Sequence, residues 1–279
     1  VQDFDPIVQK KINREQPFEL IESLMKNNLT KYFKGVNFDL LYGLPASSQS
    51  TFRNTIELTK ELSPERITLI KYGHIPKKVK HMKMIKEEDL PDEKELPIIF
   101  MESTKRLIEA GYDWVGIDHF AKKTDQLSIA KQNGKVYRNF GGETPGYTKD
   151  MISFGPTSTS GFGNHYFQNT YDLKEYHSEV TENKFPVRRG YVLQHDDLIR
   201  REVNFSLQCN QIIDFNEVNK KFNIDFNKYF KKEIKIFQQK ESEGLVKIDD
   251  SKIESTLKGR YFIRHLCQIF DTFFDYNKE

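Results

Sequence analysis

Apolar and polar positions along the first third of the chain follow the order that parallel α/β folds show. Residues 36–42 form a mostly apolar run that ends in a Gly-Leu-Pro turn, which predicts a buried strand. Ser50 and Thr51 can then cap a helix whose apolar residues over 52–62 fall near one face. Residues 66–72 return as a β-rich run. Strand, helix and strand within about 37 residues predict a βαβ unit with two parallel strands.

The middle of the chain predicts one more helix and one more strand. After a lysine-rich stretch, residues 95–110 show helical periodicity, and Gly111 stands where a helix C-terminal cap is expected. Residues 112–120 then read as a strand that ends in Ile-Asp-His-Phe. We expect this strand to bring Asp118 and His119 to its end.

From about Asp196 the pattern becomes mainly helical. Asp196 and Asp197 can cap a helix over 198–210. The other predicted elements are a helix over 226–241, two short strands over 244–249 and 252–256, and a helix over 258–270. Helices followed by a two-stranded wing are typical of winged-helix modules. We therefore predict two domains, residues 1–190 and residues 191–279, the second mainly helical and winged-helix-like.

Composition narrows the class of protein. The 279 residues are 37% hydrophobic and 30% charged, and no window approaches the roughly 18 apolar residues of a membrane span. Two cysteines argue for a reducing compartment, hence the cytoplasm, and against a disulfide framework or a Cys-rich metal site. The net charge of +2 gives no bulk preference for nucleic acid.

Two strings carry a polar residue into a turn in the way that the strand ends of α/β barrels do. They are Val1-Gln2-Asp3-Phe4 and Phe38-Asp39-Leu40-Leu41-Tyr42-Gly43-Leu44-Pro45. Barrel enzymes hold their chemistry at the carboxyl ends of the strands. The chain begins with Val1 and opens on such a site, so we expect it to be the back portion of a larger enzyme.

Asp39 and Arg14 are the charged candidates for ligand binding. Asp39 is predicted to be a buried carboxylate that either accepts from ribose hydroxyls or bonds backbone N–H groups of the next turn, and the residues leave both open. The guanidinium of Arg14 can form a bidentate pair with a ligand carboxylate, although a solvated or Glu15-paired arginine is commoner. Gln2 can donate and accept at its strand end.

Weaker signals lie further along. Gly73, which has no Cβ, would let a flat ligand approach the backbone, or it simply eases a turn. Arg138-Asn139-Phe140 is another polar strand end, and residues 154–161 form a loop of small residues suited to close backbone contact. His119 beside Asp118 can carry a proton near neutral pH, but such a pair is more often structural.

Taken together, these strings resemble the oxygen-independent coproporphyrinogen III oxidases, a radical S-adenosylmethionine family of haem biosynthesis. The resemblance covers essentially the whole chain. The matching strings, in the family's order and spacing, are Val-Gln-Asp-Phe at 1–4, Asn-Arg-Glu-Gln at 13–16, Asp-Leu-Leu-Tyr-Gly-Leu-Pro at 39–45, Tyr-Gly-His-Ile-Pro at 72–76, Asp-His-Phe-Ala at 118–121, Arg-Asn-Phe at 138–140 and Asp-Asp-Leu-Ile-Arg-Arg-Glu-Val at 196–203.

The resemblance implies an α/β fold, the C-terminal part of a partial (β/α)6 radical-SAM barrel followed by the helical domain. It implies an oxidoreductase that converts coproporphyrinogen III to protoporphyrinogen IX by oxidative decarboxylation. A [4Fe–4S] cluster, fed by an electron donor, would reduce S-adenosylmethionine, and the resulting 5′-deoxyadenosyl radical would abstract a propionate β-hydrogen. The full-length enzyme would be a cytoplasmic monomer with no membrane or nucleic-acid partner.

By the same resemblance, five residues would line S-adenosylmethionine: Gln2, Arg14, Asp39, Gly73 and Thr159. Asp39 would take the ribose hydroxyls and Arg14 the methionine carboxylate. The family's Cys-x-x-x-Cys-x-x-Cys loop is absent here, so the metal ligands are not in this chain and the fragment alone is expected to be inactive. Gly141 replaces the family's usual Gln and Thr159 a common Ile.

Two rival interpretations stay open. A haem-binding chaperone of the same superfamily would carry haem without oxidase activity, and it tends to have Val-Gln-Ser-Phe where this chain has Asp3. A winged-helix regulator built on the C-terminal part would bind DNA, but residues 201–279 carry 14 basic against 13 acidic side chains. The sequence assigns no catalytic residue and does not say which residues bind the substrate propionates.

Overall fold

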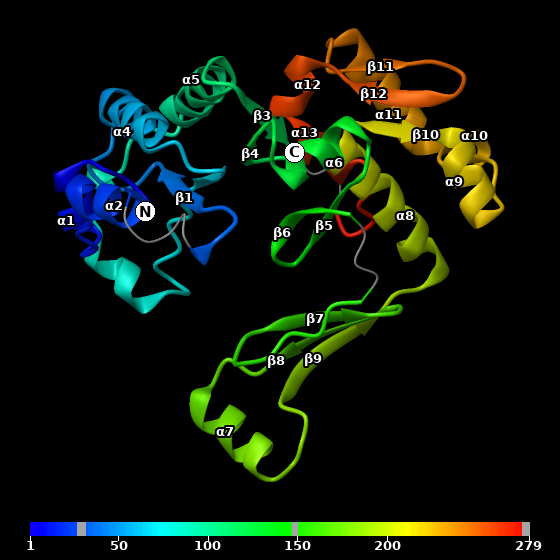
Figure 1. The fold of residues 1–279 in the computed structure, drawn as a ribbon. Helices are drawn as coiled ribbons and strands as arrows, with labels where there is room; N and C mark the ends of the chain where they lie inside the picture. Colours follow the sequence, from blue (N-terminus) through cyan, green and yellow to red (C-terminus); the bar gives the residue numbers. More distant parts are fainter. Residues whose placement is uncertain (27–31, 147–149, 275–279) are drawn as a thin grey trace. The chain divides into compact units, whose positions relative to one another are not determined.

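The structure, a computed structural model, describes residues 1–26, 32–146 and 150–274 (Figure 1). It divides into two compact units, Val1–Ile129 and Ala130–Glu279, which we call unit 1 and unit 2. The predicted domain boundary at 190/191 follows a change in sequence character and stays a prediction. Among the helices of the described residues, none is long and apolar enough to cross a bilayer.

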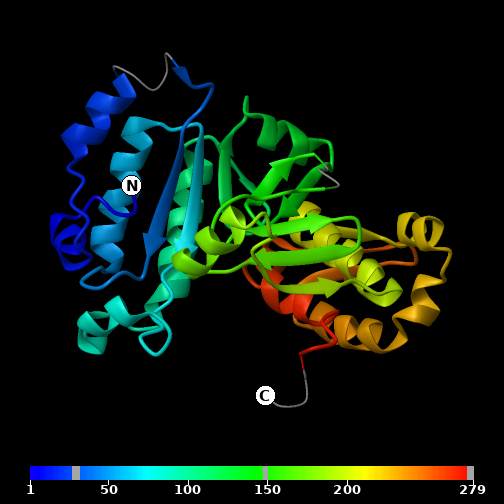
Figure 2. The same cartoon turned by 90° about the horizontal axis from the view of Figure 1, so that it is seen from below.

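Unit 1 is built on a four-stranded sheet of order β1-β2-β4-β3. Strand β1 (Asn37–Tyr42) pairs in parallel with β2 (Arg66–Lys71), and α4 (Gln49–Leu62) connects them. The predicted βαβ unit is therefore confirmed (Figure 2). The remaining helices of this region are α1 (Pro6–Lys11), α2 (Phe18–Leu24), η2 (Lys80–Met84), η3 (Glu87–Asp89), α5 (Glu95–Glu109) and α6 (Gln126–Gln132).

One face of this sheet is apolar because side chains alternate along β1. Phe38 and Leu40 are buried, whereas Asn37 and Asp39, which alternate with them, are exposed and point to the opposite face. Helices α4 and α5 cover the apolar face. Tyr42 contacts both of them: its ring lies 6.3 Å from that of Phe52 on α4 and 5.7 Å from that of Phe100 on α5. The opposite face is left for polar side chains.

The single strand predicted over 112–120 is wrong. The segment forms a hairpin of β3 (Tyr112–Val115) and β4 (His119–Lys122), and β4 runs antiparallel to β2. Gly116 adopts a φ of 57°, a left-handed conformation that lets the chain reverse. The Trp114 side chain closes the turn by donating to the Ile117 carbonyl at 2.9 Å. Asp118 consequently lies in the turn instead of at the carboxyl end of a parallel strand, and the described strands do not close a barrel.

Unit 2 contains three separate antiparallel sheets among its described residues. Its strands are β5 (Val136–Asn139), β6 (Gly142–Pro145), β7 (Thr159–Phe162), β8 (His165–Asn169), β9 (Val187–Val192), β10 (Ile212–Asp214), β11 (Val246–Ile248) and β12 (Lys252–Ser255). Its helices are α7 (Leu173–Thr181), α8 (His195–Phe205), the π-helical turn η4 (Ser206–Asn210), α9 (Phe215–Phe222), α10 (Phe226–Tyr229), α11 (Lys231–Ser242), α12 (Leu257–Tyr261) and α13 (Ile263–Gln268).

The C-terminal elements largely follow the predicted winged-helix-like order. The two-stranded wing is present as β11 and β12, and β10 adds a third strand to it. The helix predicted over 198–210 begins earlier, at His195, because Gln194 forms the capping box with Asp197. The helix predicted over 226–241 is two helices that meet at Phe230.

Aromatic side chains form the core of this C-terminal part. The rings of Phe215 and Phe226 stack with centroids 4.2 Å apart, and Phe230 contacts both Phe226 and Phe270. Because Phe230 packs between two elements, the chain breaks its helix there and both neighbouring helices reach the core.

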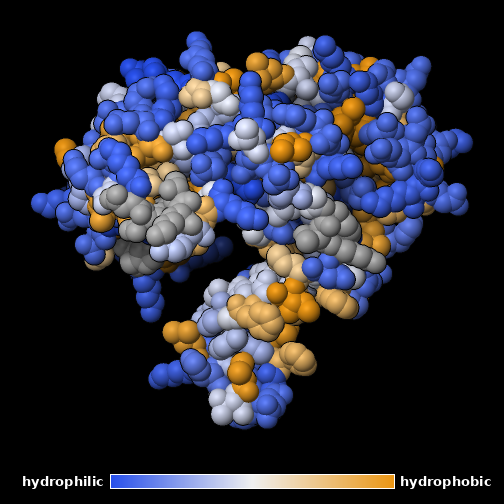
Figure 3. Space-filling view, viewed as in Figure 1, coloured by the Kyte–Doolittle hydropathy of each residue, from blue (hydrophilic) through white to orange (hydrophobic). Residues whose placement is uncertain are grey.

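The β7–β9 segment exposes hydrophobic side chains on its surface. They lie among hydrophilic ones (Figure 3), and every residue of β9 is exposed.

Candidate functional site

The parallel pair in unit 1 places two strand ends at one edge of the sheet. Strands β1 and β2 run in the same direction, so their carboxyl ends meet at Tyr42 and Lys71. The first residues of the chain join this edge, because Leu41 N–H donates to the Gln2 carbonyl at 2.8 Å. Residues 1–5 are not a strand, contrary to the strand end that the sequence predicts, but this bond holds Gln2 beside the end of β1.

Asp39 lies on the polar face of the same strand. The prediction of a buried carboxylate is wrong: Asp39 is exposed, because it alternates with the buried Phe38 and Leu40. Asn37 donates to Asp39 Oδ1 at 2.7 Å, and its amide also bonds Thr68 on β2. The carboxylate is therefore held by a neighbouring amide in the chain and open on its outer side.

Arg14 is held near this edge by a buried glutamine. The Gln9 side chain on α1 donates to the carbonyls of Asp3 and Gln16 at 2.8 and 2.9 Å, and it accepts from Gln16 N–H at 2.7 Å. Arg14 lies in the loop that these bonds fold back, where its N–H donates to the Gln9 carbonyl and its Nε to Gln16 Oε1. Its partner is thus Gln16 and not Glu15.

Electrostatics show that the charges of Arg14 and Asp39 act at the same place. The positive charge of Arg14 and the negative charge of Asp39 both act on Val1, in opposite directions. Both side chains therefore lie near the segment that carries Gln2. The structure brings together Gln2, Arg14 and Asp39; what they bind stays a prediction.

Gly73 and Thr159 complete the predicted set. Gly73 follows β2 at the same edge, where Tyr72 N–H donates to the Tyr42 carbonyl, and a Cβ built on Gly73 would meet no atom within 4 Å. The backbone of Gly73 thus faces open space. Thr159 belongs to unit 2, where it begins β7 and its carbonyl accepts from the Ser153 hydroxyl at 2.8 Å.

Asp3, beside Gln2, is a buried carboxyl that the sequence analysis used only to separate the oxidase from the haem-binding chaperone. Burial raises its pKa to about 6, although Asp5 N–H and the Thr55 hydroxyl donate to its Oδ1. Its Oδ2 atom is buried with no hydrogen-bond partner among the described residues. The aspartate of the Val-Gln-Asp-Phe string, directly before Phe4, was the available signal.

The cysteines do not fit an iron–sulfur cluster. Cys209 is buried and Cys267 half-buried, and burial raises the pKa of each thiol to about 12. Cluster ligands are thiolates, usually four in number, so two protonated buried thiols cannot hold one.

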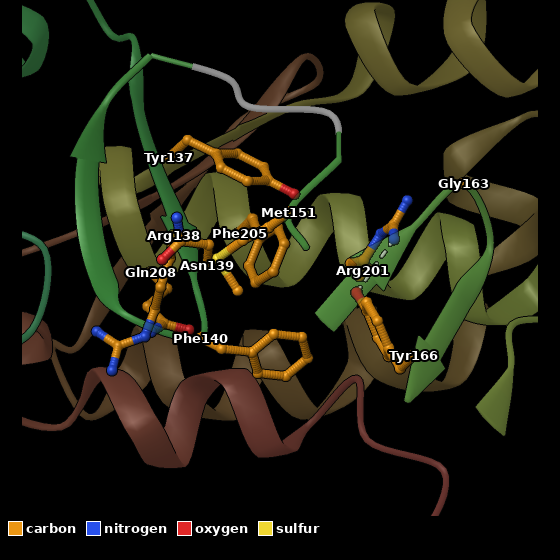
Figure 4. Close-up of a pocket in the computed structure, with 11 residues that line it drawn as sticks. Tyr137, Arg138, Asn139, Phe140, Met151, Gly163, Tyr166, Arg201, Phe205 and Gln208 are labelled. Carbon is orange, nitrogen blue, oxygen red and sulfur yellow. Dashed lines mark hydrogen bonds between the residues drawn. The ribbon is translucent and has the colours of Figure 1, made fainter. Parts of the chain in front are cut away.

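Unit 2 contains a pocket of about 240 Å³ (Figure 4). Four aromatic rings line it in two edge-to-face pairs: Tyr137 with Phe205, and Phe140 with Tyr166, each pair with centroids 5.1 Å apart. Arg138 and Arg201 bring positive charge to its wall. The predicted polar strand end Arg138-Asn139-Phe140 therefore lines a pocket, together with distant residues that the sequence did not connect to it.

Comparison with known proteins places this arrangement in a family. The chain is 37% identical over 273 residues to the oxygen-independent coproporphyrinogen III oxidase of Escherichia coli K12, covering 98% of this chain and 60% of that protein. With the protein of the same name from Thermostichus vulcanus it shares 36% identity over 274 residues, covering 98% of this chain and 84% of that protein. The chain belongs to the oxygen-independent coproporphyrinogen III oxidase family.

The fold supports membership of this oxidase family. The structure matches the solved coproporphyrinogen III oxidase (HemN) of Escherichia coli, described as a radical SAM enzyme, with a TM-score of 0.94 and 36% identity. The match covers 98% of this chain and 63% of that one. The family model of the HemN C-terminal domain matches residues 193–262. The chain spans about 60% of the length of the first of these oxidases, and the predicted α/β radical-SAM class is confirmed.

Proposed function

We propose that this chain forms part of an oxidoreductase of haem biosynthesis that converts coproporphyrinogen III to protoporphyrinogen IX by oxidative decarboxylation of propionate side chains. Membership of the oxidase family supports the reaction. The observation that carries the proposal within this chain is the convergence of Gln2, Arg14 and Asp39 at one sheet edge. Polar groups of these three types suit one ligand that bears both a nucleoside and an amino acid.

In this proposal, each residue at the carboxyl edge of the sheet contacts a different part of the ligand. The Asp39 carboxylate, open on one side, accepts hydrogen bonds from the ribose hydroxyls, and the Arg14 guanidinium pairs with the methionine carboxylate. Gln2 bonds a polar edge of the ligand, and Gly73 admits it close to the backbone. Thr159, in unit 2, stays a prediction of the family resemblance. Bound at this edge, S-adenosylmethionine would supply the radical chemistry of the reaction, together with an iron–sulfur cluster held by residues outside this chain.

The test of the cofactor site is binding of S-adenosylmethionine to the full-length protein, measured by equilibrium dialysis. Removing the Asp39 charge by Asp39→Asn should weaken binding roughly tenfold or more, because a charge-assisted hydrogen bond becomes a neutral one. Asp250→Asn, at an exposed position between β11 and β12, is the matched control and should bind normally. Equal affinity of the Asp39 and Asp250 variants would contradict the proposed site.

Gly73→Ala tests the open space beside the backbone. The added methyl group meets no protein atom within 4 Å, so the melting temperature should not change. We expect weaker binding of S-adenosylmethionine all the same, because the methyl group would occupy space that the ligand needs. Unchanged binding would place the ligand away from Gly73.

Activity separates the oxidase from the haem-carrier alternative. The reconstituted full-length protein, kept anaerobic with a reductant, should form protoporphyrinogen IX from coproporphyrinogen III, detected as protoporphyrin fluorescence after oxidation. A protein that retains added haem but leaves coproporphyrinogen III unchanged would be a carrier instead.

A further inference from the structure

The pocket of unit 2 combines a flat aromatic slot with a cation. We propose that it binds one pyrrole ring of the tetrapyrrole substrate with its propionate side chain, and that Arg201 is the ligand of the propionate carboxylate. This inference rests on the proposed function, because that function names a propionate-bearing tetrapyrrole as substrate. The sequence analysis named no residue that binds the substrate propionates, and this inference assigns one.

The walls of the pocket fit an aromatic ring. Tyr137 and Phe205 pack edge to face with an interplanar angle of 79°, and Phe140 and Tyr166 do the same at 81°. Figure 4 shows Tyr137, Met151 and Phe205 on one side of the pocket and Arg201 with Tyr166 on the other. A flat, apolar ring can enter between the two aromatic pairs and meet ring faces and edges, which favour further aromatic contacts.

The size of the pocket limits how much of the substrate it can hold. Its volume of about 240 Å³ lies below the roughly 300–1,000 Å³ of pockets that hold a whole drug-sized ligand. A tetrapyrrole macrocycle carries four pyrrole rings and exceeds this volume. A single ring with its side chain is the part that fits, and the rest of the macrocycle would remain outside.

The two arginines have different roles. Arg138 on β5 pairs with Glu143 on β6 at 2.7 Å, and the Glu143 side chain is fully buried, so the charge of Arg138 is balanced within the hairpin. Arg201 on α8 donates from Nη1 to the Tyr166 hydroxyl at 3.1 Å. The bond to Tyr166 fixes the guanidinium at the pocket wall. A guanidinium has five N–H donors in a fork that matches a carboxylate, so it can serve a ligand in addition to Tyr166.

The charge of the wall points to an anion. Among the described residues that line the pocket, two are arginines and none is an aspartate or glutamate. An arginine beside aromatic rings recognises a carboxylate on an aromatic body, which is the chemistry of a pyrrole propionate. Gly161 and Gly163 of the β7–β8 hairpin also line the pocket, without side chains.

The experiment is a binding titration of this 279-residue chain with coproporphyrin III, the fluorescent oxidised form, followed by fluorescence anisotropy. We expect saturable binding that Arg201→Gln weakens roughly tenfold or more, as loss of a charge-assisted bond predicts. Arg189→Gln, at an exposed position on β9 of the same unit, makes the same charge change and should bind as the wild type does. Equal weakening by both variants, or no weakening by Arg201→Gln, would overturn the proposal.

A change in the ligand tests the same point without any variant. The tetramethyl ester of coproporphyrin III keeps the macrocycle but has no carboxylate, so the wild-type chain should bind it roughly tenfold more weakly or worse. Equally tight binding of the ester would overturn the assignment of Arg201. Displacement of coproporphyrin III by adenosine would also overturn it, since the pocket would then take a nucleoside.

The titration needs neither cluster nor turnover, so its result is independent of the activity assay. If the full-length protein does not oxidise coproporphyrinogen III while Arg201 still governs porphyrin binding, the proposed function fails and the pocket assignment stands. If turnover occurs but the Arg201 variant binds coproporphyrin III normally, the pocket assignment fails alone.

Discussion

The side-chain amide nitrogen of Gln9 lies 2.8 Å from the main-chain oxygen of Asp3, so helix α1 is tied to the segment that carries Gln2. The same amide group bonds the N–H and carbonyl of Gln16 and thereby fixes the loop of Arg14. Gln9 is 4% exposed, which means that water cannot replace these bonds. A single buried side chain therefore sets the distance between two residues of the candidate site.

We expect Gln9→Leu to destabilise unit 1 by about 2 kcal/mol, because it leaves buried backbone groups without partners. Urea unfolding followed by the fluorescence of Trp114, the only tryptophan of the chain, measures this within unit 1. Gln238→Leu, at an exposed position on α11 in unit 2, should leave that transition unchanged. A Gln9 variant as stable as the wild type would show that the bonds to Asp3 and Gln16 contribute nothing.

The buried carboxyl of Asp3 makes the stability of unit 1 depend on pH. Burial raises its pKa from 3.8 to about 6, so between these values the folded state holds a proton that the unfolded state releases. Stability therefore falls as pH rises through this window, and the loss is complete above the folded pKa. A shift of two units corresponds to about 3 kcal/mol at most.

Asp3→Asn should remove this slope between pH 4 and pH 7, since an amide does not titrate. Urea midpoints of the two proteins, read from Trp114 fluorescence across that range, measure the difference in slope. Asp250→Asn, at an exposed position, serves as the control and should keep the wild-type slope. Parallel curves for wild type and Asp3→Asn would show that Asp3 titrates alike in both states.

The start of α4 offers a direct comparison of two serines. The sequence predicts a cap at Ser50 and Thr51, but in the structure Ser48 is the cap: its hydroxyl accepts from Thr51 N–H, and its own N–H donates to Thr51 Oγ1 at 2.8 Å. Ser48→Ala should cost about 1 kcal/mol in urea unfolding. Ser50 lies in the exposed first turn of α4 and is not the cap. Ser50→Ala should therefore lower the free energy of unfolding by less than half as much. Equal losses would contradict the observed capping box.

The two cysteines should be unreactive in the folded chain. Their pKa values of about 12 keep both thiols protonated at pH 8, and the thiolate is the reactive form. Labelling with a chromogenic disulfide reagent should be slow in buffer and fast in guanidinium chloride, which exposes both. Reconstitution of the chain with iron and sulfide should give no charge-transfer absorbance. Fast labelling of the folded chain, or a stable brown product, would contradict the burial of the thiols.

The predicted and observed folds agree where a local pattern decides the structure. The apolar run before Gly43 and the helix that follows it were enough to predict β1, α4 and β2. The hairpin of β3 and β4 was missed because Gly116 stands within an apolar run, and only its left-handed conformation reveals the turn. The break at Phe230 was missed because the helical periodicity continues through it, while packing against Phe270 fixes the bend.

The residues of the candidate site likewise fall into those that the sequence could name and those that only the fold reveals. Motif residues such as Gln2, Arg14 and Asp39 could be named from the sequence, because the family strings mark them. Gln9 was not visible, since nothing in the pattern shows that an amide in an amphipathic helix is buried. Arg201 stands in a family string, but its place in the pocket was missed, because its partner Tyr166 lies 35 residues away along the chain and only the fold brings them together.

Strand β9 has a consequence for the behaviour of the isolated chain. It pairs with β8 along one side, and no described strand pairs with its other side. A free edge of this kind can recruit the same edge of a second molecule and begin aggregation. Arg188 and Arg189 stand on this exposed strand, and their positive charges repel an identical strand that approaches it. The charge of the two arginines thus disfavours self-association through the free backbone edge of β9.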